Sequence, residues 1–289
     1  GDEILHIGKT FSTADTLLYT LVDFNGSSAG TTTIDLWAEA NTDFQVGVGI
    51  LNATTGRFDD GGYYRRARAN RTYTETLTDS DGEQLTVKTY CNGVDYYNNR
   101  SNITISLDHS AQTSNNQRAI IIVKATTGTV HLWGSKCTFI DGGFRALTAG
   151  DNTYTVGERG GTGQSIISVG AYTTRTSWVS RAGSPYNISY HATEGELAYF
   201  SSHGPLLDGR TKPDITAPGQ MTIAPINRFN TSYTGGGYAT NAFTFNSQTE
   251  YFGAMQGTSM AAPTVAGIMA LWLQRDPTLT PARAIALVH

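Results

Sequence analysis

Apolar and polar residues alternate in short runs over about the first 140 residues of the chain. In Thr33-Ile-Asp-Leu-Trp-Ala38 and Phe44-Gln-Val-Gly-Val-Gly-Ile50, every second side chain is apolar, which is the period of a strand with one buried face. Turn clusters separate the runs, and no segment of helical period interrupts them. The spacing predicts an all-β sandwich or jelly roll with these strands: 5–11, 16–24, 32–40, 44–51, 71–78, 84–91, 103–109, 118–125 and 129–133.

The pattern changes after a glycine-rich stretch, 142–163, which we interpret as a junction. Residues 164–172 predict a buried strand, 173–197 an ordered surface loop, and 204–219 turns and a short strand. Thr280-Pro281 predicts the start of a final helix, since Thr is a good cap and Pro suits a first turn. We assign no role to 227–250.

The strongest helix signal is the segment 259–273. Its apolar residues occupy all sides of a helical wheel, which predicts a buried helix with Ser259 at or beside its N-terminus and Pro263 in the first turn. Unpaired N–H groups and the positive end of the helix dipole would stabilise an oxyanion that forms beside Ser259. The alternative is a plain N-cap, because serine is among the commonest capping residues.

Composition excludes several classes of function. The formal net charge is −4 and only 15% of residues are charged, so we expect no nucleic-acid partner and no attraction to an anionic membrane. The longest apolar run, 260–273, is too short to span a bilayer. Cys91 and Cys137 are too few for a disulfide framework and are expected to be free thiols.

Three motifs resemble the subtilase (subtilisin-like serine protease) superfamily, in that family's order and rough spacing. They are Phe200-Ser-Ser-His-Gly-Pro205, Lys212-Pro-Asp-Ile-Thr-Ala-Pro-Gly219 and Gly257-Thr-Ser-Met-Ala-Ala-Pro263, and Ile166-Ile-Ser-Val-Gly-Ala-Tyr172 looks like the family strand that leads into them. The family's usual Pro-His is Pro263-Thr264 here. The resemblance implies that Ser259 is the nucleophile of a bacterial-type serine endopeptidase acting on protein or peptide substrates.

The resemblance also implies a domain organisation. Residues 1–141 would be a jelly-roll insertion, 142–163 a junction, and 164–289 the C-terminal part of an α/β subtilisin-like domain. Residues 1–3 would then follow the segment that carries the family's oxyanion-hole Asn. We interpret the start at Gly1, without Met, as a trimmed chain, and the family implies a secreted or extracytoplasmic protein.

The family's Asp and His segments, which should precede Ser259, are absent. Gly150-Asp-Asn152 matches the oxyanion-hole Asn only superficially, and we interpret His203 as structural because the family varies at that position. We therefore expect this chain to be inactive alone, to need the missing N-terminal part of the catalytic domain as a partner, and to self-associate through uncovered apolar faces. The alternative is a binding or adhesion protein, or a pseudoprotease, centred on the jelly roll.

The remaining polar clusters predict no cofactor and no metal. The segment 79–83 has some calcium-ligand character, but Asp81-Gly82 is more typical of a hairpin turn. Some subtilases hold a cation near the backbone that matches Ala171, with a carboxylate such as Asp214, but Lys212 could supply that charge. The histidines of the strand region are expected to be packing or surface residues, and the arginines of 65–71 a solvated loop face: His6, His109, His131, Arg65, Arg66, Arg68 and Arg71.

Overall fold

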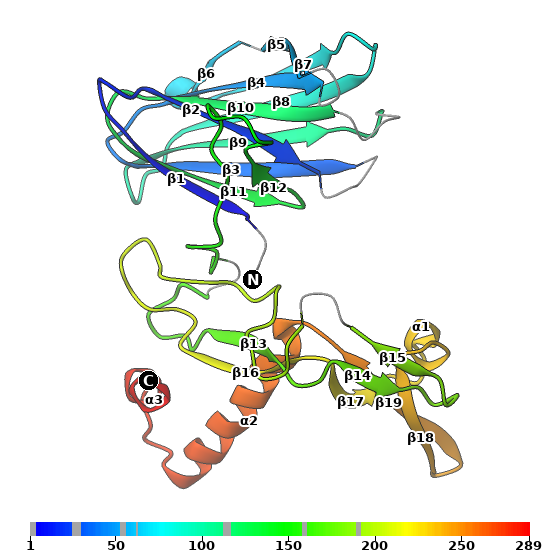
Figure 1. Ribbon diagram of the computed structural model, residues 1–289. Coiled ribbons are helices and arrows are strands. Elements are labelled where there is room, and N and C mark those ends of the chain that lie inside the picture. The colour runs from blue at the N-terminus through cyan, green and yellow to red at the C-terminus, as the bar shows by residue number, and fades with distance from the viewer. Residues whose placement is uncertain are drawn as a thin grey trace. The chain divides into compact units, whose positions relative to one another are not determined.

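A computed structural model describes residues 4–24, 30–52, 56–61, 63–111, 117–157, 161–188 and 192–289. The chain divides into two compact units, Ile4–Asp151 and Asn152–His289 (Figure 1). The boundary lies inside the segment 142–163 that the sequence marks as a junction. The expectation for residues 1–3 lies outside the described residues.

The described strands of the first unit form two antiparallel sheets, which lie one over the other as two layers (Figure 1). The first sheet has the order β1 (His6–Phe11), β11 (Gly128–Ser135), β3 (Thr31–Ala40), β9 (Arg100–Asp108), β8 (Gln84–Val94), β7 (Arg71–Thr78). The second has the order β12 (Thr138–Ile140), β2 (Leu17–Asp23), β10 (Gln117–Lys124), β4 (Gln45–Asn52), β5 (Arg57–Gly61), and β6 (Arg65–Arg66) also pairs with β4.

The period-two pattern explains the sandwich core. In β3 the side chains of Ile34, Leu36 and Ala38 are buried, while those of Asp35 and Trp37 between them are partly exposed. The inward residues of both sheets join in one apolar cluster, which is how a sandwich removes one face of each sheet from water. All nine predicted strands are present, with ends shifted by at most three residues. The sequence missed the short strands β5, β6 and β12.

The second unit contains a parallel pair of strands covered by a helix. β13 (Val169–Thr173) pairs in parallel with β16 (Ile215–Gln220), and α2 (Thr258–Arg275) packs on both (Figure 1). Small residues dominate this contact, and the buried cluster is Ala171, Ala198, Ala217, Ala261 and Val265. Alanines allow the helix to approach the strands closely, so the backbone around the start of α2 is tightly confined.

The prediction that this helix is buried is wrong for the chain as it stands. Only Ala261 and Val265 of α2 are buried, while the exposed fraction is 41% for Ile268, 65% for Leu271 and 45% for Leu273. The reason is that two strands can cover only one face of a helix that is apolar all round. The apolar faces are therefore partly uncovered, as the sequence led us to expect.

Two other segments differ from their predictions. The predicted loop 173–197 contains a hairpin of β14 (Ser177–Val179) and β15 (Pro185–Asn187). The unassigned segment 227–250 contains α1 (Thr231–Thr234) and β18 (Ala239–Phe245), and it leads into β19 (Gln248–Met255), which lies between β17 (Thr222–Ile226) and β18 in a sheet. The β18–β19 turn has positive φ at Asn246 and Ser247, as a two-residue hairpin turn of type I′ requires.

The chain ends in the predicted helix, α3 (Pro281–Val288). The side chain of its N-cap, Thr280, accepts a hydrogen bond from the amide of Arg283 at 3.3 Å, and Pro281 occupies the first turn. The strand predicted over 164–172 begins only at Val169, since residues 164–165 lie in a turn and 166–168 form no regular secondary structure.

Candidate functional site

The N-terminus of α2 is fixed by a glycine in a conformation closed to other residues. Gly257, the N-cap of α2, has φ 140° and ψ 155°, a region that only glycine adopts without strain. Its amide donates to the carbonyl of Gly219 at 2.8 Å, and its carbonyl accepts from the amide of Met260 at 3.0 Å. The first turn of the helix is thus tied to the end of β16.

A second glycine lets the helix come this close. A Cβ atom added at Gly219 would lie 2.4 Å from the Cβ of Ala171 and 3.1 Å from the carbonyl oxygen of Gly257. No side chain can occupy this space unless β13, β16 or α2 moves. The Ala-Pro-Gly end of the second motif therefore packs directly against Gly257, the first residue of the motif that contains Ser259.

Ser259 is the second residue of α2 and is exposed. The N-cap is Gly257, and no side chain caps the helix, so Ser259 does not serve as the plain cap that was the alternative interpretation. An exposed hydroxyl in the first turn lies beside the N–H groups that have no partner in the helix. This arrangement would stabilise negative charge on an oxygen beside the hydroxyl.

Pro263 lies in the second turn, as the sixth residue of α2, so the prediction that it occupies the first turn is wrong. Its missing N–H is the one that would have bonded to the carbonyl of Ser259 four residues earlier. The sequence could not show this, because the helix begins at Thr258, directly after the glycine tie, and not at the proline.

The first motif, Phe200-Ser-Ser-His-Gly-Pro205, also contacts β13. The hydroxyl of Ser201, which is buried, accepts from the amide of Ala171 at 3.0 Å. A Cβ atom at Gly204 would lie 2.0 Å from the carbonyl oxygen of Lys212, so this motif also packs directly on the next one. The backbone of His203 exchanges hydrogen bonds with Thr155, through the Thr155 hydroxyl at 2.8 Å and its amide at 2.9 Å.

A buried ion pair lies directly before β16. The Nζ atom of Lys212 is 2.6 Å from Oδ2 of Asp214, and the exposed fractions of the two side chains are 4% and 2%. Lys212 also donates to the carbonyl of Ile166 at 2.8 Å, and Asp214 accepts from the amide of Ser168 at 2.6 Å. The lysine therefore supplies the positive charge beside Asp214.

The pKa of Asp214 follows from these contacts. Burial raises the pKa, but the hydrogen bonds from Lys212, from the Ser168 amide and from His289 (3.1 Å to Oδ1) outweigh burial and hold the pKa below its usual value. The carboxylate is ionised at neutral pH, and it ties the segment before β13 to the start of β16.

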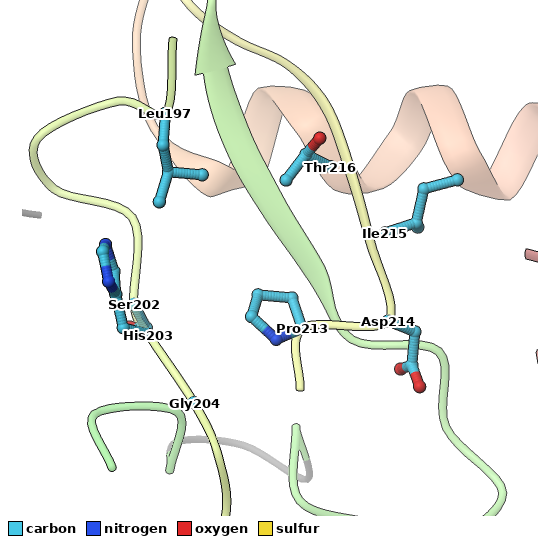
Figure 2. Close-up of a pocket in the computed structure, with 8 residues that line it drawn as sticks. All are labelled: Leu197, Ser202, His203, Gly204, Pro213, Asp214, Ile215 and Thr216. Carbon is cyan, nitrogen blue, oxygen red and sulfur yellow. The ribbon is translucent and has the colours of Figure 1, made fainter. Parts of the chain in front are cut away.

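A shallow pocket of about 370 Å³ lies beside this ion pair (Figure 2). Leu197 and His203 lie on one side of it, and Asp214 and Ile215 on the other (Figure 2). Its lining residues are Leu197, Ser202, His203, Gly204, Pro213, Asp214, Ile215 and Thr216. Because Ser259 does not line it, the pocket is not a cleft around the candidate nucleophile.

The other predicted features fall as follows. The carboxylate of Asp79 accepts from the amides of Asp81 and Glu83, both at 2.9 Å, in the turn between β7 and β8, so the segment 79–83 is a hairpin turn. Within the described part of the chain, no cluster of three His, Cys, Asp or Glu side chains could hold a metal ion. Asn152, from the superficial match Gly150-Asp-Asn152, accepts a hydrogen bond through its backbone carbonyl from the Thr155 hydroxyl at 3.0 Å.

Both cysteines are free, as expected, and both are buried. Burial raises the pKa of both thiols, and that of Cys137 reaches about 12, so neither is a nucleophile at neutral pH. Arg65 lies over the rings of Tyr63 and Tyr73 and pairs with Glu75 at 3.2 Å, so at least this arginine of 65–71 has partners within its own unit. In the described residues, no helix has the length and hydropathy needed to cross a membrane.

The subtilase family model matches residues 16–288, a range that extends over most of both units. The serine protease AprX of Bacillus subtilis is 39% identical over 101 residues, which are 33% of this chain and 20% of AprX. An uncharacterized protein of Aquifex aeolicus is 28% identical over 166 residues, or 52% of this chain and 67% of that protein. The structure of the Clostridium perfringens CspB protease has a TM-score of 0.60 at 19% identity and covers 98% of this chain, which corresponds to 50% of CspB.

Proposed function

Because the chain belongs to the subtilase family, we propose that it carries the nucleophile, Ser259, of a subtilisin-type serine endopeptidase. The observation that carries the proposal is the position of Ser259, an exposed residue in the first turn of α2, where no side chain caps the helix and the Gly257–Gly219 hydrogen bond holds its start. Named proteases among the relatives, AprX and CspB, are consistent with this class of reaction. The proposed substrates are proteins or peptides.

In the proposed reaction, the Ser259 hydroxyl attacks a peptide carbonyl while a histidine accepts its proton. The oxyanion of the tetrahedral intermediate would lie near the N–H groups of the first turn of α2. The C–N bond then breaks, the proton passes to the leaving amine, and an ester forms on Ser259. Water cleaves the ester and regenerates the hydroxyl.

The histidine and the aspartate that orients it are proposed to come from a segment outside this chain, and the chain alone is proposed to be inactive. Two observations support this. The chain lacks the family's Asp and His segments, and the matched residues make up only 20% of AprX and 50% of CspB. Export from the cytoplasm stays a prediction from the family resemblance.

We further interpret Ile4–Asp151 as a jelly roll inserted into the catalytic domain. The strand order supports this, because β1, β11, β3 and β9 are neighbours in one sheet while β2, β10, β4 and β5 are neighbours in the other. Successive strands β1 to β4 and β9 to β12 thus alternate between the two sheets, as in a roll of two Greek keys. The likeness to CspB, which covers 98% of this chain, includes both units.

The test compares the full-length gene product with this chain. We expect the full-length protein to cleave a casein or peptide substrate, Ser259→Ala to abolish cleavage, and Ser177→Ala, an exposed serine of β14, to retain it. We expect this chain alone to show no cleavage. Undiminished cleavage by full-length Ser259→Ala would refute the nucleophile, whereas cleavage by this chain alone would refute only its proposed inactivity.

A further inference from the structure

Two histidines and an aspartate meet on the face of the first sheet that points away from the sandwich core. His6 of β1 pairs in register with Trp133 of β11, and Gly8 pairs with His131. The rings of His6 and His131 stack with centroids 5.2 Å apart, and Trp133 contacts both, at 5.3 Å and 5.6 Å. These two strand histidines, predicted to be packing or surface residues, therefore pack against each other and against Trp133.

Hydrogen bonds join the three side chains in a row. Nδ1 of His6 is 2.8 Å from Oδ1 of Asp151, and Nε2 of His6 is 2.9 Å from Nδ1 of His131. The side chain of His6 is 1% exposed and that of Asp151 is 51% exposed, so the row leads from a buried ring to solvent. We call Asp151, His6 and His131 the histidine clasp.

The clasp joins the two chain ends of the sandwich unit, Ile4–Asp151. The amide of His6 donates to the carbonyl of Asp151 at 3.0 Å, and the amide of Asp151 donates to the carbonyl of His6 at 2.7 Å. A Cβ atom at Gly150 would lie 2.9 Å from the carbonyl oxygen of His6, so only glycine lets the outgoing chain approach. The segment that leaves the unit is therefore held on the strand that enters it.

Both rings lie over Gly8, where no side chain separates them from the backbone of β1. A Cβ atom at Gly8 would lie 3.0 Å from both Cε1 and Nδ1 of His131 and 3.3 Å from Cε1 of His6. A larger residue at position 8 would therefore crowd the two rings.

The row of Asp151, His6 and His131 can take up one proton without losing a hydrogen bond, but not two. With both rings neutral, Nδ1–H of His6 donates to Asp151, and Nε2 of His6 accepts from Nδ1–H of His131. One added proton can be held by His6, which then donates from both nitrogens while His131 accepts. A second proton places an N–H on each of the two nitrogens that are 2.9 Å apart, which removes their hydrogen bond and sets two positive rings against each other.

The charges around the rings act in both directions. Burial lowers the pKa of His6 below its ordinary value, and the hydrogen bond and charge of Asp151 offset only part of this. Burial, the neighbouring His6 and Arg100 lower the pKa of His131, while Glu39 and Asp151 raise it, and the net pKa is about 4. Because the folded unit binds these protons less readily than an unfolded chain with an ordinary histidine pKa of 6.5, the clasp is complete above that pH and weakens as the pH falls toward 4.

We propose that the histidine clasp is an acid-sensitive contact. Its hydrogen bonds hold the outgoing segment 150–151 on β1 in neutral solution, and their loss in acid releases that segment. The release is local, since the sandwich core contains none of the three side chains. The proposal concerns the sandwich unit alone and does not depend on Ser259.

Hydrogen exchange followed by mass spectrometry on the whole chain tests this, at about pH 7 and about pH 4.5, with rates corrected for intrinsic exchange. We expect the protection of peptides that contain His6 and Asp151 to fall by about tenfold or more in acid, while a peptide from β10 stays protected. In His131→Asn, the amide nitrogen can replace Nδ1 without titrating, so the acid response should largely disappear. His109→Asn, a matched change at a buried histidine that stacks on Phe24 elsewhere in the unit, should keep it.

An acid response in His131→Asn equal to that of the unchanged protein would refute the proposal, as would the absence of any response in the unchanged protein. If His131→Asn fails to fold, the unchanged chain with ¹⁵N-labelled histidine decides the matter. Coupled titration of His6 and His131 well below pH 6.5, with neutral rings protonated at Nδ1, supports the clasp. Independent titration of both rings near pH 6.5 overturns it.

Discussion

Replacing Lys212 by methionine should destabilise the unit Asn152–His289 strongly, and more so at neutral than at acidic pH. The change keeps most of the side-chain volume but removes the ammonium group 2.6 Å from Asp214. Asp214 stays almost fully buried, at 2% exposure, with the Ser168 amide and His289 as its remaining donors. A buried carboxylate that loses its cation is among the most unfavourable single changes in a folded protein.

The magnitude is limited by the alternative of protonating the carboxylate. Holding a carboxyl of ordinary pKa 3.8 in its neutral form requires about 1.36 kcal/mol per pH unit, or about 4 kcal/mol at pH 7 and about 1.6 kcal/mol at pH 5. Removing one partner of a buried pair typically costs about 3–5 kcal/mol, which agrees with this limit at neutral pH. The penalty should therefore fall by roughly half or more between about pH 7 and about pH 5.

The unchanged protein should behave in the opposite way. Because the folded pKa of Asp214 lies below its usual value, its contribution to stability is present above pH 3.8 and is lost only as the pH falls through the folded pKa. Acidification to about pH 5 should therefore leave the contribution of this pair unchanged while it relieves the variant. The difference in unfolding free energy between the unchanged protein and Lys212→Met should therefore become smaller as the pH falls.

Denaturant unfolding at both pH values measures the effect, and hydrogen exchange of peptides from 164–220 assigns it to this unit. Lys212→Met combined with Asp214→Asn should recover much of the loss, because no buried charge remains. Arg228→Met, at a partly exposed pair with Glu250 in the same unit, is the matched control and should cost less than about 1 kcal/mol. A loss below about 1 kcal/mol for Lys212→Met at pH 7, with no dependence on pH, would refute the reasoning.

Three further predictions concern packing and thiol chemistry. Gly219→Ala should cost about 1–3 kcal/mol in denaturant unfolding, because its Cβ would lie 2.4 Å from that of Ala171, whereas Gly267→Ala in α2, where a Cβ meets nothing within 4 Å, should be neutral or stabilising; equal effects would contradict the packing argument. The chain should self-associate and bind apolar dyes, and Leu271→Glu should reduce both; a monodisperse, dye-free chain in light scattering would count against uncovered apolar faces. Cys137 should react with a thiol reagent only after denaturation, and fast labelling of the native chain would show that it is not buried.

The sandwich strands could be predicted because their signal is local. In β3 and β8, inward and outward residues alternate along each strand, so the pattern depends only on the strand's own residues. The same reasoning fails for β12, which has only three residues, and for β5, whose sequence Arg57-Phe-Asp-Asp-Gly61 has no alternation. These short strands exist because a neighbouring strand pairs with them.

Burial of α2 could not be predicted from its sequence, because it depends on what packs against the helix. The apolar wheel indicates how much surface the helix could bury, and β13 and β16 cover only the side that carries Ala261 and Val265. The conformation of Gly257 and the position of Pro263 also needed the structure, since each depends on where the helix begins. The pairing of Lys212 with Asp214 was within reach, because the two residues are only two positions apart.

The histidine clasp could not be predicted from the sequence at all, because its residues are far apart in the chain. His6 lies 125 residues from His131 and 145 residues from Asp151, and no local period or motif connects them. What brings them together is the pairing of β1 with β11 and the return of the chain to β1 at Asp151. Side chains that meet only through such long-range pairing give no sign of each other in a single sequence.

The candidate site depends on space more than on polar contacts. Gly219 and Gly204 stand where an added Cβ would clash, with Ala171 at 2.4 Å and with the carbonyl of Lys212 at 2.0 Å, and a Cβ at Gly170 would be in tight contact, 3.1 Å from Pro213, Ser201 and Thr216. Only one of the three, Gly219, also accepts a hydrogen bond from the N-terminus of α2. Because the position of Ser259 follows from these close approaches, adding one methyl group at Gly219 should disturb the proposed nucleophile more than removing a polar group from the nearby pocket, whose lining does not include Ser259.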